Sequence, residues 1–387
     1  MSKELISITP PDKPLDAGLL ERPGAFLWWY LDLLDEHGHG AVLIWSWGLP
    51  FLPGIASAAR REILTTPRTR PSLTIAIYED FELECYTLQE YDEELASWEV
   101  EAYQGDARAQ RWQFGESTIR VWRTGLDVPR GAERVHVEVD LQERVPGSLH
   151  KLVGHVRVEG VARATRPEDE AARHEEHDHD WSPLLGPARG ELDIYHGTRR
   201  YVIEGRAYHD RNGAPKPLHE LGFERWIWGR IPAEDRELIY YVLWPSIEGA
   251  PRCVAMEILS SGQTIVHEDV SVRLSGERRE LAGMTWAQHT DVFVKGKRWC
   301  SVETRAIVDN GPFYLRFFID AVHEHGASVG YGEACTPSRI DLEHHRPLVQ
   351  MRVGQPSGDS IWRPLFTGPR QGRVERLFTQ FLPGNVR

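Results

Sequence analysis

Two pairs of polar and aromatic residues carry the side chains of this chain that are best suited to acid–base chemistry. His179 and Trp181 form the first pair, and Tyr208 and Asp210 form the second. Side chains two residues apart on an extended strand point to the same face, so each pair projects from one face of its strand. If both strands line one cavity, that cavity holds an imidazole, an indole, a phenol and a carboxylic acid. Such a set could protonate an unactivated double bond and guide the resulting cation.

Asp210 is the candidate general acid of this set. An exposed aspartic acid, with a pKa of about 4, is ionised at neutral pH and cannot donate a proton. Burial among aromatic groups disfavours the charged form and raises the pKa of a carboxyl group. Tyr208 could then hydrogen-bond the carboxyl group or the incoming water, Trp181 could present its π face to a cation, and His179 could orient the water or accept its proton. Tyr208 and Asp210 could also form an ordinary hydrogen-bonded pair at a strand end.

Further candidates follow the second pair along the chain. Asn212 precedes a glycine, which is typical of a turn, and could also buttress the acid. Trp226, Trp228 and Arg230 share one strand face, where aromatic packing of an inner wall explains the two tryptophans. An inward-facing Arg230 needs a carboxylate partner. If that partner is Asp210, the pKa of Asp210 falls and its role as an acid weakens.

The elements that must position these residues are short β-strands. Residues 26–34 and 41–47 flank a glycine-containing turn and are expected to form a hairpin. Similar short runs recur at nearly even spacing along the rest of the chain, and residues 90–96 are the clearest candidate for a helix. This pattern predicts an all-β protein built from antiparallel barrels or sandwiches.

Charge and proline content divide the chain into four parts. Residues 1–22 are polar and proline-rich and are expected to form a flexible leader, followed by an N-terminal β-domain over residues 23–165. The strongly charged residues 166–185 predict a linker and the start of a second domain. Residues 186–387 are expected to form a C-terminal β-barrel domain.

Composition excludes several classes of function. The net charge of −13 and the lack of a Lys/Arg block argue against a nucleic-acid partner. The sequence has no dinucleotide-binding fingerprint, Walker loop or nucleophile elbow, and we expect no cofactor. Its 4 cysteines are scattered, which favours a reducing compartment. The 14 Trp, 12 Tyr and 12 Phe suit a large apolar ligand, but they suit a β-sandwich core equally well.

Two local features resemble a metal site and a membrane span. His174, His177 and His179 lack a complete set of zinc ligands at standard spacing, so we expect a solvated acidic linker and no metal. Residues 41–59 are uncharged but contain glycines and prolines in the middle. We therefore expect a buried strand followed by an apolar loop instead of a transmembrane helix. We expect a cytoplasmic protein, as its cysteines favour, and the loop over residues 49–55 could give it peripheral contact with a membrane surface.

Four segments in collinear order resemble one known family. They read Trp28-Trp29-Tyr30-Leu31-Asp32, His179-Asp180-Trp181-Ser182-Pro183, Gly205-Arg206-Ala207-Tyr208-His209-Asp210-Arg211-Asn212-Gly213 with the following Trp226-Ile227-Trp228-Gly229-Arg230, and Gly311-Pro312-Phe313-Tyr314-Leu315-Arg316. The chain resembles the carotenoid 1,2-hydratase (hydroxyneurosporene synthase) family. That family shares a lipocalin-like two-domain scaffold with fungal decalin-forming Diels–Alderases.

The resemblance implies two consecutive lipocalin-like antiparallel β-barrel or sandwich domains, with the pocket between them. It also implies a cofactor-independent hydratase that adds water across a terminal C=C bond of an acyclic carotenoid or another long isoprenoid. The catalytic residues it implies are His179, Trp181, Tyr208 and Asp210, and we expect a substrate-binding set of Trp226, Trp228, Arg230, Asn212, Trp29 and Tyr314. Two alternatives remain open on the same scaffold: a pericyclase or terpenoid cyclase, and a non-catalytic isoprenoid- or lipid-binding protein.

Overall fold

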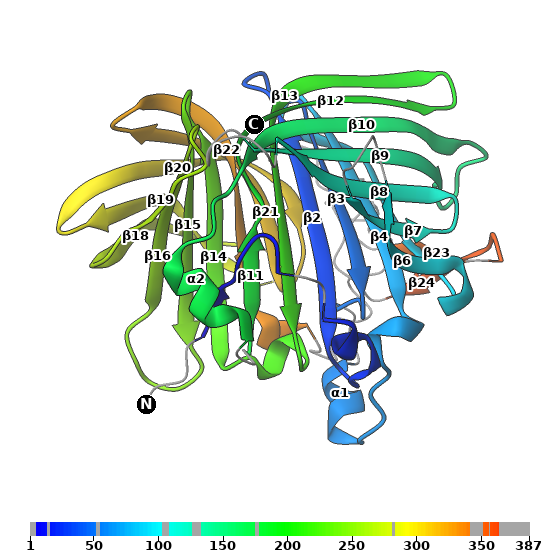
Figure 1. Cartoon of the computed structure of the whole chain (residues 1–387). Coiled ribbons are helices and arrows are strands. Elements are labelled where there is room, and N and C mark those ends of the chain that lie inside the picture. The colour runs from blue at the N-terminus through cyan, green and yellow to red at the C-terminus, as the bar shows by residue number, and fades with distance from the viewer. Residues whose placement is uncertain are drawn as a thin grey trace, which may run out of the picture.

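The computed structural model describes residues 5–13, 16–51, 55–102, 108–125, 133–174, 178–280, 283–340, 351–355 and 357–363. Within these ranges nearly all regular structure is β-strand, as the sequence predicts, and the strands form two large curved sheets (Figure 1). The helices are short: α1 (Ile55–Arg60), α2 (Pro167–Ala171) and 3₁₀ turns at Ala17–Glu21, Pro67–Thr69, Glu93–Leu95, Ala172–His174, Leu218–Glu220 and Pro337–Arg339. The helix expected over residues 90–96 is only the 3₁₀ turn Glu93–Leu95.

The first sheet holds most of the N-terminal half of the chain. Its main path runs in the order β24-β23-β5-β4-β3-β2-β13-β12-β10-β9-β8-β7-β6, and β1 and β11 join it beside β13. The bounds are β1 Ser7–Ile8, β2 Phe26–Leu34, β3 Gly40–Trp47, β4 Pro71–Glu79, β5 Glu82–Glu90, β6 Ala96–Ala102, β7 Arg108–Phe114, β8 Ser117–Thr124, β9 Arg134–Arg144, β10 Lys151–Ala162, β11 Asp180–Pro183, β12 Leu185–His196, β13 Arg199–Ala214, β23 Met351–Gly354 and β24 Ser360–Arg363. The predicted hairpin is confirmed as β2 and β3.

The second sheet holds the next part of the chain. Its order is β17-β16-β15-β14-β22-β21-β20-β19-β18, with antiparallel pairing throughout. The bounds are β14 Phe223–Pro232, β15 Arg236–Pro245, β16 Arg252–Leu259, β17 Thr264–Val266, β18 Val270–Arg279, β19 Thr285–Val294, β20 Lys297–Asn310, β21 Tyr314–His323 and β22 Gly326–Cys335. Figure 1 shows the two sheets spreading to opposite sides of the central strands β2, β11 and β14.

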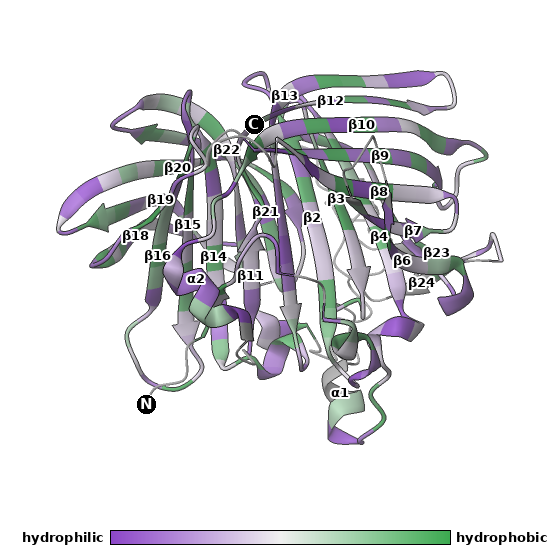
Figure 2. Cartoon of the chain, in the orientation of Figure 1, coloured by the Kyte–Doolittle hydropathy of each residue, from purple (hydrophilic) through white to green (hydrophobic). Residues whose placement is uncertain are grey.

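The apolar side chains form three cores: one enclosed by the first sheet, a central one, and one on the far side of the second sheet. Along β2, Trp29, Leu31 and Leu33 belong to a core enclosed by the first sheet, while Tyr30 and Leu34 belong to a central core. Along β15, alternate residues likewise divide between the central core and a third core on the far side of the second sheet. Apolar residues therefore occupy both faces of β2 and β15. In β9 and β10, by contrast, polar residues are interspersed with apolar ones, as the banding in Figure 2 shows.

The division between the two sheets differs from the expected domain boundary. The chain passes from the first sheet to the second between Ala214 and Phe223, later than residue 186, because β12 and β13 complete the first sheet. Near the end of the described chain, β23 pairs in parallel with β5 and so returns to the first sheet.

The leader expected over residues 1–22 is anchored to the first sheet. Ser7 and Ile8 pair in parallel with Asp180 and Trp181. The side chain of Ile6 is almost fully buried in the central core. This burial and the strand pairing hold residues 6–8 against the first sheet.

Candidate active site

The carboxyl group of Asp210 lies at the centre of a hydrogen-bond network between the two sheets. Its Oδ2 accepts hydrogen bonds from Tyr208 Oη and from Trp181 Nε1, each over 2.9 Å. Its Oδ1 accepts one from Asn212 Nδ2 over 3.1 Å. Tyr208, Asp210 and Asn212 alternate along β13, and the neighbouring strand β11 places Trp181 opposite Asn212. Alternation along one strand and pairing with the next thus bring three donors to one carboxyl group.

His179 joins this network one step farther away. Its Nε2 donates to Asn212 Oδ1 over 3.1 Å, and its Nδ1 has no partner among the described residues. Its imidazole lies among the rings of Trp28, Phe223 and Tyr241. The structure therefore brings together all four residues that the sequence selected, but His179 reaches Asp210 only through Asn212.

Burial determines the protonation of both titratable groups. Asp210 is 4% exposed, and the loss of hydration raises its pKa to about 7. The hydrogen bonds from Trp181 and Tyr208 oppose this shift, while the negative charges of Glu333 and Asp32 add to it. Burial also lowers the pKa of His179 to about 4, so its imidazole is neutral at physiological pH.

A cavity beside Asp210 has two parts that share lining residues; we call the part that Asp210 lines the inner part and the other the outer part. The inner part is lined by Trp28, Tyr30, Trp181, Asp210, Asn212, Trp226, Trp228, Tyr241 and Glu333. The outer part shares four of these residues and continues past Ile44, Ser46, Leu49, Pro50, Phe51, Thr74, Tyr86, Leu88, Tyr314 and Arg316. Strands of both sheets contribute to the walls. The cavity therefore lies between the sheets, as the resemblance implied.

Four of the six predicted substrate-binding residues line this cavity, namely Asn212, Trp226, Trp228 and Tyr314. Trp29 does not line it. Its ring packs in the core of the first sheet, stacked on Trp112 with 4.3 Å between the ring centroids. Trp28, the preceding residue, faces the cavity instead, because adjacent residues of a strand point to opposite faces.

Arg230 is the second predicted binding residue that does not line the cavity. Its guanidinium group is fully buried and forms ion pairs with Asp32 and, over 3.1 Å, with Glu237. These two carboxylates compensate the charge of a buried arginine, which is costly to leave unpaired. Since Asp210 is not a partner of Arg230, the condition that would have weakened its role as an acid is not met.

Several cavity residues were missed by sequence reasoning. Trp28 and Tyr30 alternate on β2 and face Asn212 and Asp210 across the β2–β13 pairing. Tyr241 and Glu333 come from the second sheet. The one signal in the sequence was that Trp28 and Tyr30 share a strand face, but it did not tell which face of β2 meets the cavity. The sequence near Glu333 contains no comparable signal.

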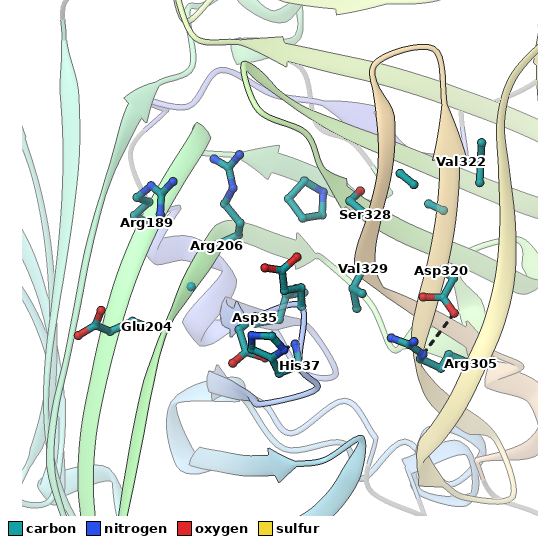
Figure 3. Close-up of a pocket in the computed structure, with 16 residues that line it drawn as sticks. Asp35, His37, Arg189, Glu204, Arg206, Arg305, Asp320, Val322, Ser328 and Val329 are labelled. Atoms are coloured by element: carbon teal, nitrogen blue, oxygen red, sulfur yellow. Dashed lines mark hydrogen bonds and ion pairs between the residues drawn. The ribbon is translucent and has the colours of Figure 1, made fainter.

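A separate groove opens at the other end of β2. It is lined by charged side chains of both signs, including Asp35, Arg189, Glu204 and Arg206, and by the ion pair between Arg305 and Asp320 (Figure 3). Its polar walls do not suit a polyene. In the part of the chain that the structure describes, no group of three or more His, Cys, Asp or Glu residues could hold a metal ion. Of the predicted histidine cluster, His177 lies outside the described residues.

Comparison with known proteins identifies a consistent set of relatives. Residues 109–361 match the family model described as "Carotenoid hydratase CrtC". A hydroxyneurosporene dehydrogenase of Chlorobaculum tepidum is 27% identical over 316 residues, covering 77% of this chain and 78% of that protein. An acyclic carotenoid 1,2-hydratase of Rubrivivax gelatinosus is 26% identical over 253 residues, covering 62% of this chain and 53% of that protein. The match therefore spans about half the length of the Rubrivivax relative.

The solved structure of CghA has a similar fold. It covers 86% of this chain and 96% of its own, with a TM-score of 0.51 and 11% identity. This similarity confirms the predicted lipocalin-like architecture. Among the described residues, no helix combines the length and apolar character that crossing a membrane requires.

Proposed function

Because this chain belongs to the carotenoid hydratase family CrtC, we propose that it adds water across a terminal C=C bond of an acyclic carotenoid or another long isoprenoid. A hydratase of this kind is a carbon–oxygen lyase. The reaction we propose is acid-catalysed and needs no cofactor. Asp210 donates the proton, and the aromatic cavity around it holds the substrate.

The buried position of Asp210 at the wall of an aromatic cavity, which raises its pKa, is the observation that carries this proposal. A terminal alkene is a weak base, so its protonation requires an acid placed directly against it in a site that excludes water. With a pKa of about 7, a large fraction of Asp210 keeps its proton at neutral pH, unlike an exposed aspartic acid. The inner cavity, which Asp210 lines, provides space for the alkene beside this carboxyl group.

The hydrogen bonds to Asp210 favour one of its oxygens as the proton carrier. Oδ2 already accepts hydrogen bonds from Tyr208 and Trp181, whereas Oδ1 accepts one from Asn212. Oδ1 therefore has the lone pair that is free to hold the proton. After proton transfer, the same three donors stabilise the carboxylate that remains.

The aromatic walls suit the cation that protonation creates. Protonation of the less substituted carbon of the terminal C=C bond leaves a tertiary carbocation on the other carbon of that bond. The inner cavity presents the rings of Trp28, Trp181, Trp226, Trp228 and Tyr241. Each π face that contacts a desolvated cation contributes roughly 0.5–2 kcal/mol. Water then adds to the cation and gives a tertiary alcohol.

We assign His179 and Asn212 to positioning. Neutral His179 donates to Asn212 Oδ1, which turns the amide nitrogen of Asn212 toward Asp210. His179 is not among the residues that line the cavity, so it acts through Asn212 and does not contact the attacking water.

Incubation with an acyclic carotenoid in H₂¹⁸O tests the proposal. We expect the wild-type protein to form a tertiary alcohol containing ¹⁸O, and Asp210→Asn to bind the carotenoid without forming this alcohol. A cyclised product without oxygen would indicate a cyclase or pericyclase. Binding without any product from the wild-type protein would indicate a carrier.

We also propose that the protein takes its substrate from a membrane surface to which it binds peripherally on the cytoplasmic side. Leu49, Pro50 and Phe51 line the outer part of the cavity, so an apolar segment lies beside the space that would hold the substrate. Flotation with liposomes tests this attachment. A protein that stays entirely in the aqueous fraction at low salt contradicts it.

A further inference from the structure

A second carboxylate, Glu333, lines the same cavity as Asp210. It belongs to both the inner and the outer part of the cavity. Glu333 lies on β22 of the second sheet, between Trp228 on β14 and Arg316 on β21. Asp210 lies on β13 of the first sheet. The two carboxyl groups therefore reach the cavity from opposite sheets.

The hydrogen bonds to Glu333 leave one of its oxygens open. Tyr314 Oη, Arg316 Nε and Arg316 Nη2 all donate to Oε1, the two arginine nitrogens over 3.3 Å and 3.2 Å. All three of these hydrogen bonds end on Oε1, and among the described residues none is directed to Oε2. The side chain is 14% exposed, whereas that of Arg316 is 2% exposed. One oxygen thus anchors the side chain, and the other is available to a molecule in the cavity.

The two carboxyl groups differ in their charged partners. Arg316 pairs with Glu333 over 3.2 Å and with Asp309 over 2.7 Å, so Glu333 has a cation as its partner. Among the described residues, Asp210 has only neutral donors, namely Trp181, Tyr208 and Asn212. Two carboxyl groups in one site with such different surroundings are suited to opposite roles, one as an acid and one as a base.

We propose that Glu333 is the general base of the hydration reaction and removes a proton from the water that attacks the cation. This inference rests on the function proposed above. Asp210 gives its proton to the less substituted carbon of the terminal C=C bond, and the oxygen of water bonds to the tertiary carbon. The proton released by that water passes to Glu333 Oε2. Transfer of a proton from Glu333 to Asp210 through solvent then restores both groups, so that one alkene and one water give one alcohol.

Glu333→Gln tests this role because it keeps the shape of the side chain and removes the base. We expect kcat to fall by about 100-fold or more, within the range usual for loss of a general base, while KM stays within about threefold. Asp309→Asn is the matched control. It removes a carboxylate from the same Arg316 but lies outside the residues that line the cavity. We expect Asp309→Asn to lower the melting temperature and to keep kcat within about threefold of the wild-type value.

Chemical rescue separates a base from a structural ion pair. In Glu333→Ala, added formate can occupy the space of the missing carboxylate, and we expect it to restore part of kcat in proportion to its concentration. Two results would overturn the inference. One is Glu333→Gln with wild-type kcat while Asp210→Asn is inactive. The other is a loss of kcat that is equal in Glu333→Gln and Asp309→Asn and is not restored by formate in Glu333→Ala. A wild-type protein that does not hydrate carotenoids contradicts the proposed function itself.

Discussion

The indole nitrogen of Trp181 donates a hydrogen bond to Oδ2 of Asp210 over 2.9 Å, although the two residues are 29 positions apart in the chain. This contact joins β11 to β13 and places an aromatic ring against the acid. It also lowers the pKa of Asp210 and so opposes the effect of burial. The strength of the acid therefore depends on a balance that single substitutions can shift.

Trp181→Phe keeps an aromatic ring and removes the donor. Because the hydrogen bond favours the carboxylate, its loss raises the pKa of Asp210 further, by roughly one unit for a hydrogen bond to a charged group. The protonated acid then persists to higher pH. We expect the basic limb of the kcat profile to move upward in Trp181→Phe and, for the same reason, in Tyr208→Phe. Trp226→Phe, which changes a cavity wall without a bond to Asp210, should leave the midpoint unchanged. A midpoint that does not move in Trp181→Phe would show that Asp210 does not control this limb.

Trp28 and Trp29 offer a test of which face of β2 holds the substrate. Trp28→Ala removes a cavity wall, so we expect weaker carotenoid binding, with a dissociation constant at least about tenfold higher. Trp29→Ala empties a site in the core of the first sheet and should cost about 3–5 kcal/mol of the free energy of unfolding. Fluorescence titration and urea unfolding measure the two effects. If Trp29→Ala weakened carotenoid binding and Trp28→Ala did not, the substrate would lie on the other face of β2.

Arg230→Met tests the structural role of the arginine. The substitution leaves Asp32 and Glu237 buried without their cation, and we expect it to lower the free energy of unfolding by about 3–5 kcal/mol. At a temperature where the variant is folded, its affinity for the carotenoid should match that of the wild-type protein. A large loss of affinity in a folded variant would show that Arg230 takes part in substrate binding.

His209 predicts how stability depends on pH. Burial lowers its pKa to about 4, below the value of about 6.5 expected in the unfolded chain. Its contribution to stability is therefore complete above pH 6.5 and is lost as the pH falls toward 4. Between pH 7 and pH 5 this loss is about 2 kcal/mol. His209→Asn can still donate to the Tyr30 carbonyl, which now accepts from Nδ1 over 2.8 Å, but it does not titrate. We expect a smaller difference in unfolding free energy between pH 7 and pH 5 in this variant, and an unchanged difference would contradict the assignment.

The strand alternation of the sequence predicted the all-β fold, and residue spacing together with the family resemblance selected the central group of the candidate site. The spacing of Tyr208 and Asp210 predicted a shared face, and their hydrogen bond confirms it. Alternation could not distinguish Trp28 from Trp29, because β2 is buried on both faces and has no polar face to mark its orientation.

Long-range pairing was the part that the sequence could not predict. Arg230 pairs with Asp32, 198 positions away, and no local pattern specifies such a partner. Glu333 approaches Asp210 only because the second sheet packs against the first across the central core. Both relationships depend on which distant strands become neighbours in the fold. The spacing of residues within one strand carries no information about those neighbours.

The protonation state of Asp210 is the central claim, and infrared difference spectroscopy measures it directly. We expect the wild-type protein, compared with Asp210→Asn, to show the C=O stretching band of a protonated carboxylic acid at pH 6. This band should disappear on titration with a midpoint near 7. A carboxyl group that is already fully ionised at pH 6, with a midpoint near the value of about 4 for an exposed aspartic acid, would contradict the claim.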